Sequence, residues 1–264
     1  MARFYSAFAV ILFLGFSTGV SAELPEGKTS DWKGFERIDF TLNERPAIIV
    51  KPKQVADGKP WIWRARFFGH RPEADLALLK NGYHLVYCDV ANLFGSPQAV
   101  EHWNRCYATI TKDYQFNPKP VLEGMSRGGL IVFNWLAANP DKASCLYLDA
   151  PVCDFKSWPG GLGKGKGSPD ASKALIAAYK FEEDTEARAW KGNPVDHADQ
   201  LGRLGIPMFV VTGDADDIVP KEENIDFLLA AWKKHNSPLE VVVKPGVGHK
   251  HGLDDPAPLI EFLL

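Results

Sequence analysis

One serine of the chain lies in a motif typical of a catalytic nucleophile. Residues 124–128 read GMSRG, which matches the pattern G-x-S-x-G. An apolar run before it predicts a strand over 119–124, and another after it predicts a helix over 127–138. Glycine-rich turns also match this pattern by chance, but only a strand-to-helix turn strains the serine and lifts its hydroxyl from the sheet. We therefore predict that Ser126 is a nucleophile and that the N–H of Arg127 helps to bind an oxyanion.

A serine hydroxyl needs a general base, and the base needs an acid to orient it. Residues 213–220 read GDADDIVP and follow a predicted strand, and residues 246–249 read GVGH and follow the next one. Because parallel strands end at one edge of a sheet, we expect both segments to lie near Ser126. The chain order of serine, acid and histidine is the order that this chemistry has on an α/β sheet.

The composition indicates what kind of fold positions the serine, the acid and the histidine. The chain has 264 residues, of which 45% are hydrophobic and 24% charged, so it can form a sizeable core. Disordered, coiled-coil and collagen-like structures are excluded, and a single large α/β domain is favoured. The net charge of -3 gives no basic field for a nucleic acid, which we do not expect as a partner.

Predicted strands and helices alternate along the chain. The opening segments 35–42 and 47–51 predict a hairpin. Strands are then expected at 61–67, 84–90, 119–124, 145–151, 207–212 and 239–244, and helices after Pro72 and at 97–113, 127–138, 221–235 and 256–264. The predicted fold class is α/β, with a mostly parallel central sheet and helices on both faces.

One segment interrupts this alternation. Residues 154–206 begin with a glycine-rich stretch and then predict helix from Asp170 to about Trp190. We expect this insertion to cover the strand ends as a lid. The stretch 160–167 resembles a phosphate-binding loop, but glycine stands where that loop has Ser or Thr. No cofactor is predicted, and because the chain has no Cys/His cluster with metal-ligand spacing, no metal is predicted either.

With these motifs the chain resembles the α/β-hydrolase family, in its serine esterase or prolyl-oligopeptidase-like branch. The resemblance covers nearly all of the chain after the first residues. The family pattern G-x-x-D-x-x-V-P selects Asp216 as the acid, and leaves Asp214 and Asp217 as turn-capping carboxylates. The family pattern G-x-G-H selects His249 as the base, with His251 as a rival.

The resemblance also implies a second oxyanion donor after the strand at 61–67. That donor is the backbone amide of Phe67 or Phe68, between which the sequence does not choose. The Arg127 side chain is a further candidate, because glucuronoyl esterases resemble this motif in placing an arginine after the serine; a purely structural arginine is the alternative. Trp158, beside the insertion, is a candidate for stacking against a sugar.

The N-terminus predicts export. Residues 1–22 combine a positive charge at Arg3, an apolar core over about 7–16 and small residues up to Ala22, which is the layout of a signal peptide. The expected division is a signal peptide at 1–22 and an α/β-hydrolase domain at 23–264, secreted or periplasmic and without stable membrane insertion after cleavage. In an oxidising compartment disulfides can persist, and three pairings are open to Cys88, Cys106, Cys145 and Cys153.

The function predicted from the sequence is that of an exported serine hydrolase. It would cleave a carboxylic ester through an acyl-enzyme, and the substrate would be a small-molecule ester or a saccharide ester. The most specific function predicted is that of a carbohydrate esterase. The alternatives are a peptidase or an acyltransferase with the same triad, or a non-catalytic binding protein on a hydrolase fold. The sequence leaves the oligomeric state open.

Overall fold

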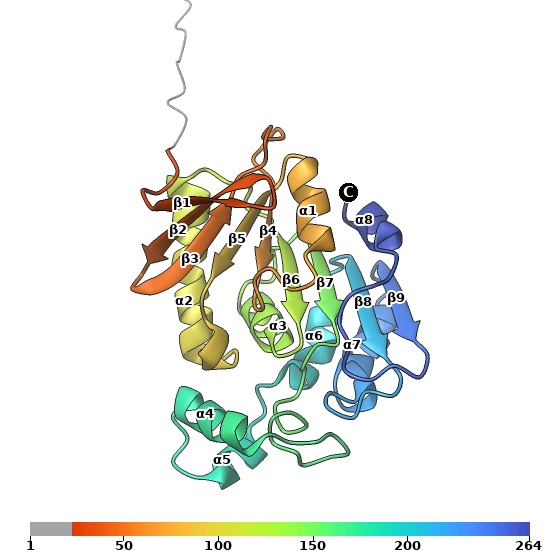
Figure 1. Cartoon of the computed structure of the whole chain (residues 1–264). Helices are drawn as coiled ribbons and strands as arrows, with labels where there is room; N and C mark the ends of the chain where they lie inside the picture. Colours follow the sequence, from red (N-terminus) through yellow and green to blue (C-terminus); the bar gives the residue numbers. More distant parts are fainter. Residues whose placement is uncertain (1–22) are drawn as a thin grey trace, which may run out of the picture.

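The computed structural model describes residues 23–264 (Figure 1). The predicted signal peptide lies outside the described residues. Within the described part, no helix has the length and apolar character needed to cross a bilayer.

A single sheet of nine strands runs through the molecule in the order β1-β2-β3-β5-β4-β6-β7-β8-β9. The first three strands and β5 pair antiparallel, and from β5 onward in this order every pair is parallel. The strands are β1 (Lys28–Trp32), β2 (Phe35–Leu42), β3 (Arg45–Val50), β4 (Trp61–Arg64), β5 (His84–Cys88), β6 (Val121–Met125), β7 (Cys145–Asp149), β8 (Met208–Gly213) and β9 (Leu239–Lys244).

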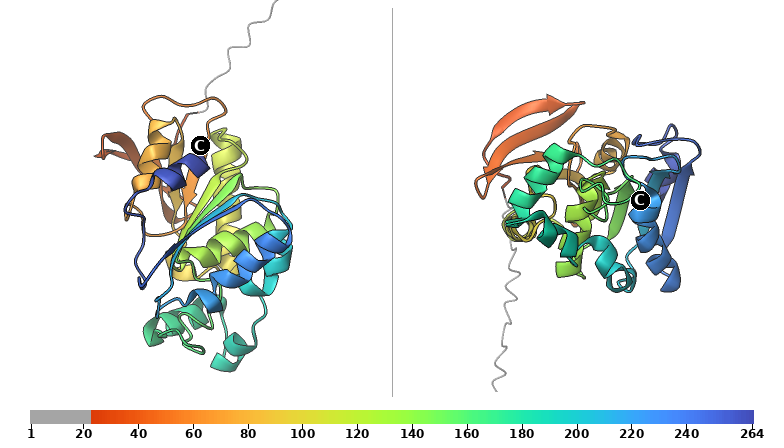
Figure 2. Two further views of the ribbon diagram at one scale, coloured as in Figure 1. Left: turned by 90° about the vertical axis from the view of Figure 1, so that its right-hand side faces the viewer. Right: turned by 90° about the horizontal axis from the view of Figure 1, so that it is seen from below.

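Helices cover both faces of this sheet (Figure 2). Apolar residues of α2, α3, α6 and α7 pack on one face, and those of α1 and α8 pack on the other. The helices are α1 (Glu73–Lys80), α2 (Pro97–Ala108), α3 (Gly128–Ala138), α4 (Pro169–Tyr179), α5 (Asp184–Ala189), α6 (Ala198–Gly202), α7 (Ile225–Lys234) and α8 (Ala257–Leu263). The predicted fold class, a mostly parallel sheet between two helical layers, is confirmed.

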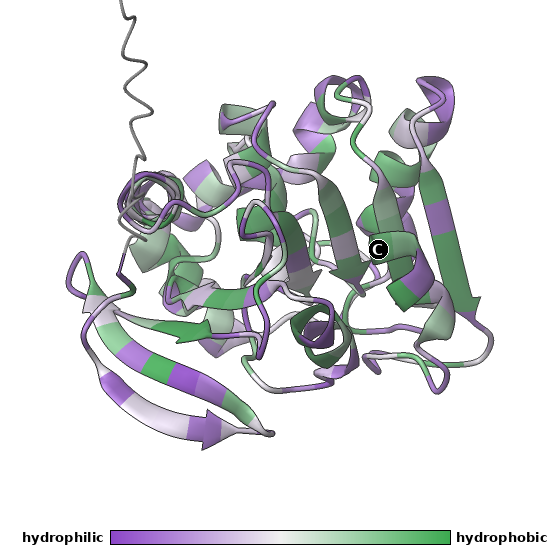
Figure 3. Ribbon diagram, turned by 90° about the horizontal axis from the view of Figure 1, so that it is seen from above, coloured by the Kyte–Doolittle hydropathy of each residue, from purple (hydrophilic) through white to green (hydrophobic). Residues whose placement is uncertain are grey.

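The central strands are apolar along their length because helices cover both of their sides. Every residue of β4, β6, β7 and β8 is buried, and hydrophobic residues dominate these strands (Figure 3). Trp63 of β4 stacks on Trp103 of α2 with ring centroids 4.0 Å apart, which joins the sheet to its helical layer. The few charged residues inside these strands are therefore exceptional.

Several predicted elements have different bounds in the structure. The strand expected at 61–67 ends at Arg64, and the last turn of the helix expected at 97–113 is a π-helix over 109–113. Strand β1 was not predicted, because its sequence KTSDW is polar and its residues are mostly exposed at the sheet edge.

The insertion also differs from its prediction. In place of one helix from Asp170 to about Trp190 there are two, α4 and α5. Lys180 takes a left-handed conformation that ends α4, and Glu183 and Glu186 form a capping box that begins α5. Both helices lie beyond the carboxyl ends of the central strands (Figure 1). Their opening and closing as a lid stays a prediction.

Candidate active site

Ser126 occupies the sharp turn between β6 and α3. Its φ angle is 48°, in the left-handed region that L-residues other than glycine rarely adopt. The turn is held from both sides, because the Ser126 N–H donates to the carbonyl of Asp149 at 2.9 Å and its own carbonyl accepts from Val152 at 2.8 Å. Only glycine fits at position 129, where a Cβ would lie 2.6 Å from the Cβ of Pro151.

Two hydrogen bonds connect the serine to a histidine and an aspartate. Ser126 Oγ lies 2.9 Å from His249 Nε2, and His249 Nδ1 lies 2.7 Å from Asp216 Oδ2. With its Nδ1–H donated to Asp216, the neutral ring presents a lone pair at Nε2 to accept the serine proton. These three residues lie on loops that follow β6, β8 and β9, so the parallel sheet brings them to one edge.

The surroundings of Asp216 favour its ionised form. Its second oxygen accepts the N–H groups of Ile218 and Val219 at 3.0 and 2.9 Å. Burial alone would raise the pKa of this carboxyl, but hydrogen bonds from His249 and from these two amides outweigh it, and the pKa lies below its usual value. The carboxylate is therefore ionised at neutral pH and orients the imidazole.

The rival residues have other partners. Asp214 accepts the N–H of Gly246 at 2.6 Å, in the turn-capping role expected of it, and Asp217 forms an exposed ion pair with Lys166. His251 lies 3.2 Å through its Nδ1 from Asp149. None of these three joins the hydrogen-bonded chain that begins at Ser126.

Asp149 was not singled out from the sequence, although it joins two parts of the site. Its carbonyl holds the N–H of Ser126, and its buried carboxylate holds His251 and, at 2.6 Å, the N–H of Gly252. The turn that carries the nucleophile is thus tied to the loop that carries the base. An acidic residue at the end of the apolar run CLYLD was the signal available in the sequence.

The backbone N–H groups that the sequence offers as oxyanion donors form no other hydrogen bond within residues 23–264. Among the described residues, the N–H groups of Phe67, Phe68 and Arg127 have no acceptor. Arg64 Nε donates to the carbonyls of Arg66 and Phe67 at 3.1 and 3.2 Å. In a trans peptide the carbonyl and the following N–H point in opposite directions, so the N–H groups of Phe67 and Phe68 point away from Arg64. The choice between these two as the second donor stays open.

The guanidinium that orders this loop is fully buried in a cluster of charges. Arg64 Nη1 lies 2.6 Å from Asp75 and 2.7 Å from Glu123, and all three side chains are at most 1% exposed. Its other terminal nitrogen donates to the carbonyl of His70. Burial raises the pKa of Glu123 well above its usual value. Sequence reasoning missed this cluster, although Arg64 and Glu123 are the charged residues of the buried strands β4 and β6.

The remaining predicted site residues gather beside the nucleophile. The Arg127 guanidinium lies 5.1 Å from the ring centroid of Phe94 and 6.0 Å from that of Trp158. Trp158 is therefore close to the site and half-buried. His70 also approaches, with its ring 5.9 Å from that of His251.

All four cysteines of the chain lie in the described part as buried free thiols. Cys106 is closest to other reactive groups, with its sulfur 3.4 Å from His102 Nε2. Residues 23–264 also contain no group of three or more His, Cys, Asp or Glu side chains arranged to hold a metal ion.

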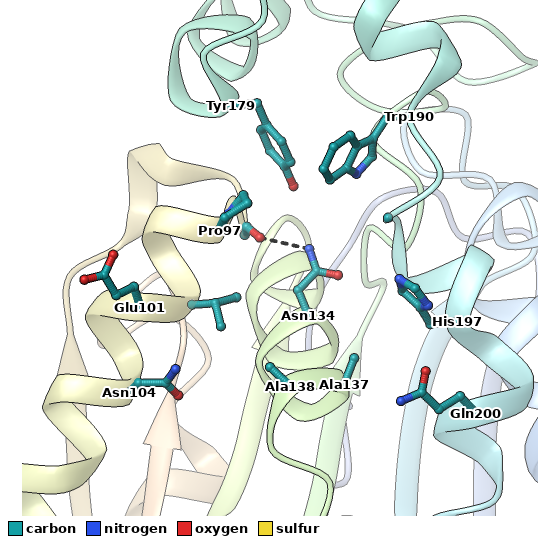
Figure 4. Close-up of a pocket in the computed structure, with 13 residues that line it drawn as sticks. Pro97, Glu101, Asn104, Asn134, Ala137, Ala138, Tyr179, Trp190, His197 and Gln200 are labelled. Atoms are coloured by element: carbon teal, nitrogen blue, oxygen red, sulfur yellow. Dashed lines mark hydrogen bonds between the residues drawn. The ribbon is translucent and has the colours of Figure 1, made fainter.

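A cavity lies away from the triad (Figure 4). It measures about 430 Å³ and opens between α2, α3 and the insertion. Tyr179 and Trp190 face Asn134 across it, and Asn134 is held by a hydrogen bond to the carbonyl of Gly95 at 2.9 Å. None of the three triad residues contributes to its walls.

Comparison with models of known families shows to which family the chain belongs. Residues 105–258 match the model of the prolyl oligopeptidase family, and this segment contains Ser126, Asp216 and His249. The chain belongs to the prolyl oligopeptidase family. Members of this family are serine hydrolases with the α/β-hydrolase fold, so the resemblance inferred from the motifs is confirmed. A search of curated proteins finds no match.

Several solved structures with the same fold are described as peptidases. A puromycin-hydrolyzing peptidase of Mycobacterium tuberculosis superposes with a TM-score of 0.66 at 14% identity, over 87% of this chain and 38% of the other. An acylaminoacyl peptidase of Pyrococcus horikoshii gives 0.62 at 15% identity, over 82% and 38%. Dipeptidyl peptidase 4 of Porphyromonas gingivalis gives 0.61 at 15%, over 86% and 34%. The chain thus spans little more than a third of the length of these proteins.

Proposed function

We propose that the protein hydrolyses an acyl bond through a covalent intermediate on Ser126. The observation that carries this proposal is the continuous chain of hydrogen bonds from Ser126 through His249 to Asp216, at 2.9 and 2.7 Å. Ser126 Oγ attacks the substrate carbonyl while its proton passes to His249 Nε2. The tetrahedral oxyanion accepts hydrogen bonds from the Arg127 N–H and from the N–H of Phe67 or Phe68.

Two transfers complete the reaction. His249 returns the proton to the leaving group, which departs as an amine or an alcohol and leaves the acyl group on Ser126. A water molecule then attacks the acyl carbonyl and gives a proton to His249. The bond between the acyl carbon and Ser126 Oγ breaks, Oγ takes the proton back from His249, and the acid is released. Asp216 stays an anion throughout and stabilises the imidazolium that forms in each step.

The favoured substrate class is a peptide or another amide of a carboxylic acid. The prolyl oligopeptidase family and the peptidases with the same fold support this choice. A carboxylic ester is the second candidate, because the same triad cleaves esters and an alcohol leaves with less help from the general acid than an amine needs. The half-buried ring of Trp158 beside Arg127 favours an ester carried by a sugar as the specific form of this second candidate.

A matched pair of chromogenic substrates separates these candidates. We would measure kcat/KM for the 4-nitroanilide and the 4-nitrophenyl ester of one acyl group, with Ser126→Ala as the control for both. A peptidase turns over the anilide, whereas an esterase turns over the ester alone. Hydrolysis of either substrate that persists in Ser126→Ala would contradict the mechanism, and the absence of any turnover in folded wild-type protein would favour the non-catalytic alternative.

We also propose that the protein is exported after cleavage at Ala22, on the layout of residues 1–22. Sequencing the N-terminus of the protein recovered from its native cell tests this. A mature chain that begins at Glu23 is expected, and a chain that retains residues 1–22 would contradict it.

A further inference from the structure

Two arginines beside the nucleophile form no ion pair with any residue in the described part of the chain. Arg66 follows β4, and Arg127 follows Ser126. The two backbones are close, since a Cβ added to Gly128 would lie 3.4 Å from the Cβ of Arg66. Both residues line one narrow recess of about 10 Å³, together with Phe94 and other residues of the 90–95 segment.

Neither guanidinium has a hydrogen bond or an ion pair with any residue in 23–264. The Nε of Arg66 is buried with no partner. The charge of Asp89 acts on Arg66 without forming an ion pair. Its Oδ1 accepts hydrogen bonds from Tyr87 Oη and from the N–H of Ala91. Burial lowers the pKa of Arg66, and burial together with the charge of Arg66 lowers the pKa of Arg127 to about 10.

This arrangement differs from that of the other buried arginine. Arg64 is also removed from water, but its guanidinium is paired with the side chains of Asp75 and Glu123. Two half-buried cations without a counter-ion repel each other and lose hydration, which is unfavourable unless an anion joins them. A planar guanidinium matches a carboxylate through two parallel hydrogen bonds, so a pair of them is suited to a planar anion.

Aromatic rings fix the orientation of both groups. The Arg66 guanidinium lies 4.7 Å from the ring centroid of Phe67. The Arg127 guanidinium lies 5.1 Å from the ring centroid of Phe94 and 6.0 Å from that of Trp158, and these two rings are neighbours, 6.5 Å apart. Contacts of a guanidinium with ring faces are attractive and hold its plane without satisfying its N–H groups. The donors are therefore positioned before a ligand arrives, which reduces the entropy lost on binding.

We propose that Arg66 and Arg127 form a subsite for a carboxylate carried by the substrate close to its scissile carbonyl. This inference rests on the proposed hydrolase function and narrows its substrate class to anionic acyl compounds. The backbone N–H of Arg127 then serves the oxyanion, while its side chain serves the substrate anion.

Two pairs of esters test the subsite on either side of the scissile bond. The first pair, 4-acetoxybenzoate and 4-acetoxybenzamide, differs by one charge in the leaving group. The second pair, the 4-nitrophenyl esters of glutaric acid and of pentanoic acid, differs by one charge in the acyl group. The rate of each ester with Ser126→Ala is subtracted as background. We expect wild-type protein to prefer the anion of at least one pair by about tenfold or more in kcat/KM, as charge-assisted hydrogen bonds allow.

Variants of Arg66 show whether the pair causes that preference. Arg66→Gln is expected to bring the ratio of the anionic to the neutral substrate to within about threefold of unity, and Arg66→Lys to retain part of it, because lysine keeps the charge without the planar fork. Arg105→Gln is the matched control, since Arg105 lies on the surface of α2 in an exposed ion pair, and its ratio should equal that of the wild type. Thermal melts verify that each variant is folded.

The outcomes separate the subsite from the hydrolase function. Equal kcat/KM within both pairs, or an Arg66→Gln variant that lowers both members of a pair alike, would overturn the subsite while leaving the hydrolase intact. If none of these esters is turned over, cleavage of esters is excluded for this set, and calorimetric titration of 4-acetoxybenzoate and 4-acetoxybenzamide into Ser126→Ala then decides the subsite. Tighter binding of the anion that is lost with Arg66→Gln supports it, and equal binding of both compounds overturns it.

Discussion

Replacing Asp216 by asparagine tests the role of the acid with little change of shape. The amide oxygen can still accept the N–H groups of Ile218 and Val219, so the loop should keep its path. The amide nitrogen, however, would face His249 Nδ1, where the carboxylate now lies at 2.7 Å. The imidazole would then place its proton on Nε2 and offer Ser126 no lone pair.

The expected loss in kcat is on the order of 10⁴-fold, which is the effect of holding a triad histidine in the wrong tautomer. It corresponds to about 5 kcal/mol of transition-state stabilisation, at about 1.4 kcal/mol for each factor of ten. Steady-state hydrolysis of a 4-nitrophenyl ester measures the loss. Urea unfolding measures stability, which should change by less than about 1 kcal/mol because the isosteric amide keeps the hydrogen bonds from Ile218 and Val219.

The neighbouring Asp217→Asn is the matched control. Asp217 carries the same chemistry one residue away, but its partner is the exposed Lys166. Its activity should stay within about twofold of the wild type, because exposed ion pairs contribute little. An Asp216→Asn variant that keeps more than a tenth of the wild-type kcat, or an Asp217→Asn variant that loses as much as Asp216→Asn, would refute the assignment of the acid.

Three further predictions follow from the scaffold around the triad. In Arg64→Lys the positive charge is kept, but a lysine cannot donate to all the carbonyls of the following loop that Arg64 reaches. The value of kcat should fall by roughly tenfold to a hundredfold with KM nearly unchanged, and an unchanged kcat would contradict this role. Burial lowers the pKa of His84 from 6.5 to about 4, so the unfolded chain binds the proton first as the pH falls through this range. The free energy of unfolding should therefore drop by up to about 3 kcal/mol as the pH falls from 6.5 to 4, and it should drop less steeply in His84→Gln. Identical pH dependence of urea unfolding in the two proteins would show that His84 does not cause the drop. His251→Gln should keep its activity within about tenfold, because this ring bonds to Asp149 rather than to Ser126; a loss as large as that of a triad residue would show that it takes part in proton transfer.

The fold could be predicted because its signals are local and repeated. Short apolar strands alternate with amphipathic helices, and alternation of this kind admits few arrangements other than a parallel sheet between helical layers. The positions of Ser126, Asp216 and His249 could be predicted for a related reason. Each lies in a short motif directly after a strand, so the sheet alone brings the three to one edge.

The features that could not be predicted from the sequence depend on contacts between distant segments. Arg64, Asp75 and Glu123 come from three elements, and nothing in the neighbourhood of each residue shows that the others surround it. The break of the insertion at Lys180 depends on a left-handed residue that no glycine marks. The second oxyanion donor could not be chosen, because it depends on how the buried Arg64 bends the loop that follows β4.

The most direct test of the central claim is covalent labelling of the nucleophile. Wild-type protein and Ser126→Ala would be treated with a fluorophosphonate, and the modified peptide would be identified by mass spectrometry. The hydrogen bonds from Ser126 through His249 to Asp216 predict a single adduct on Ser126 that is absent from Ser126→Ala. Folded wild-type protein that stays unlabelled, or an adduct that persists in Ser126→Ala, would contradict the account.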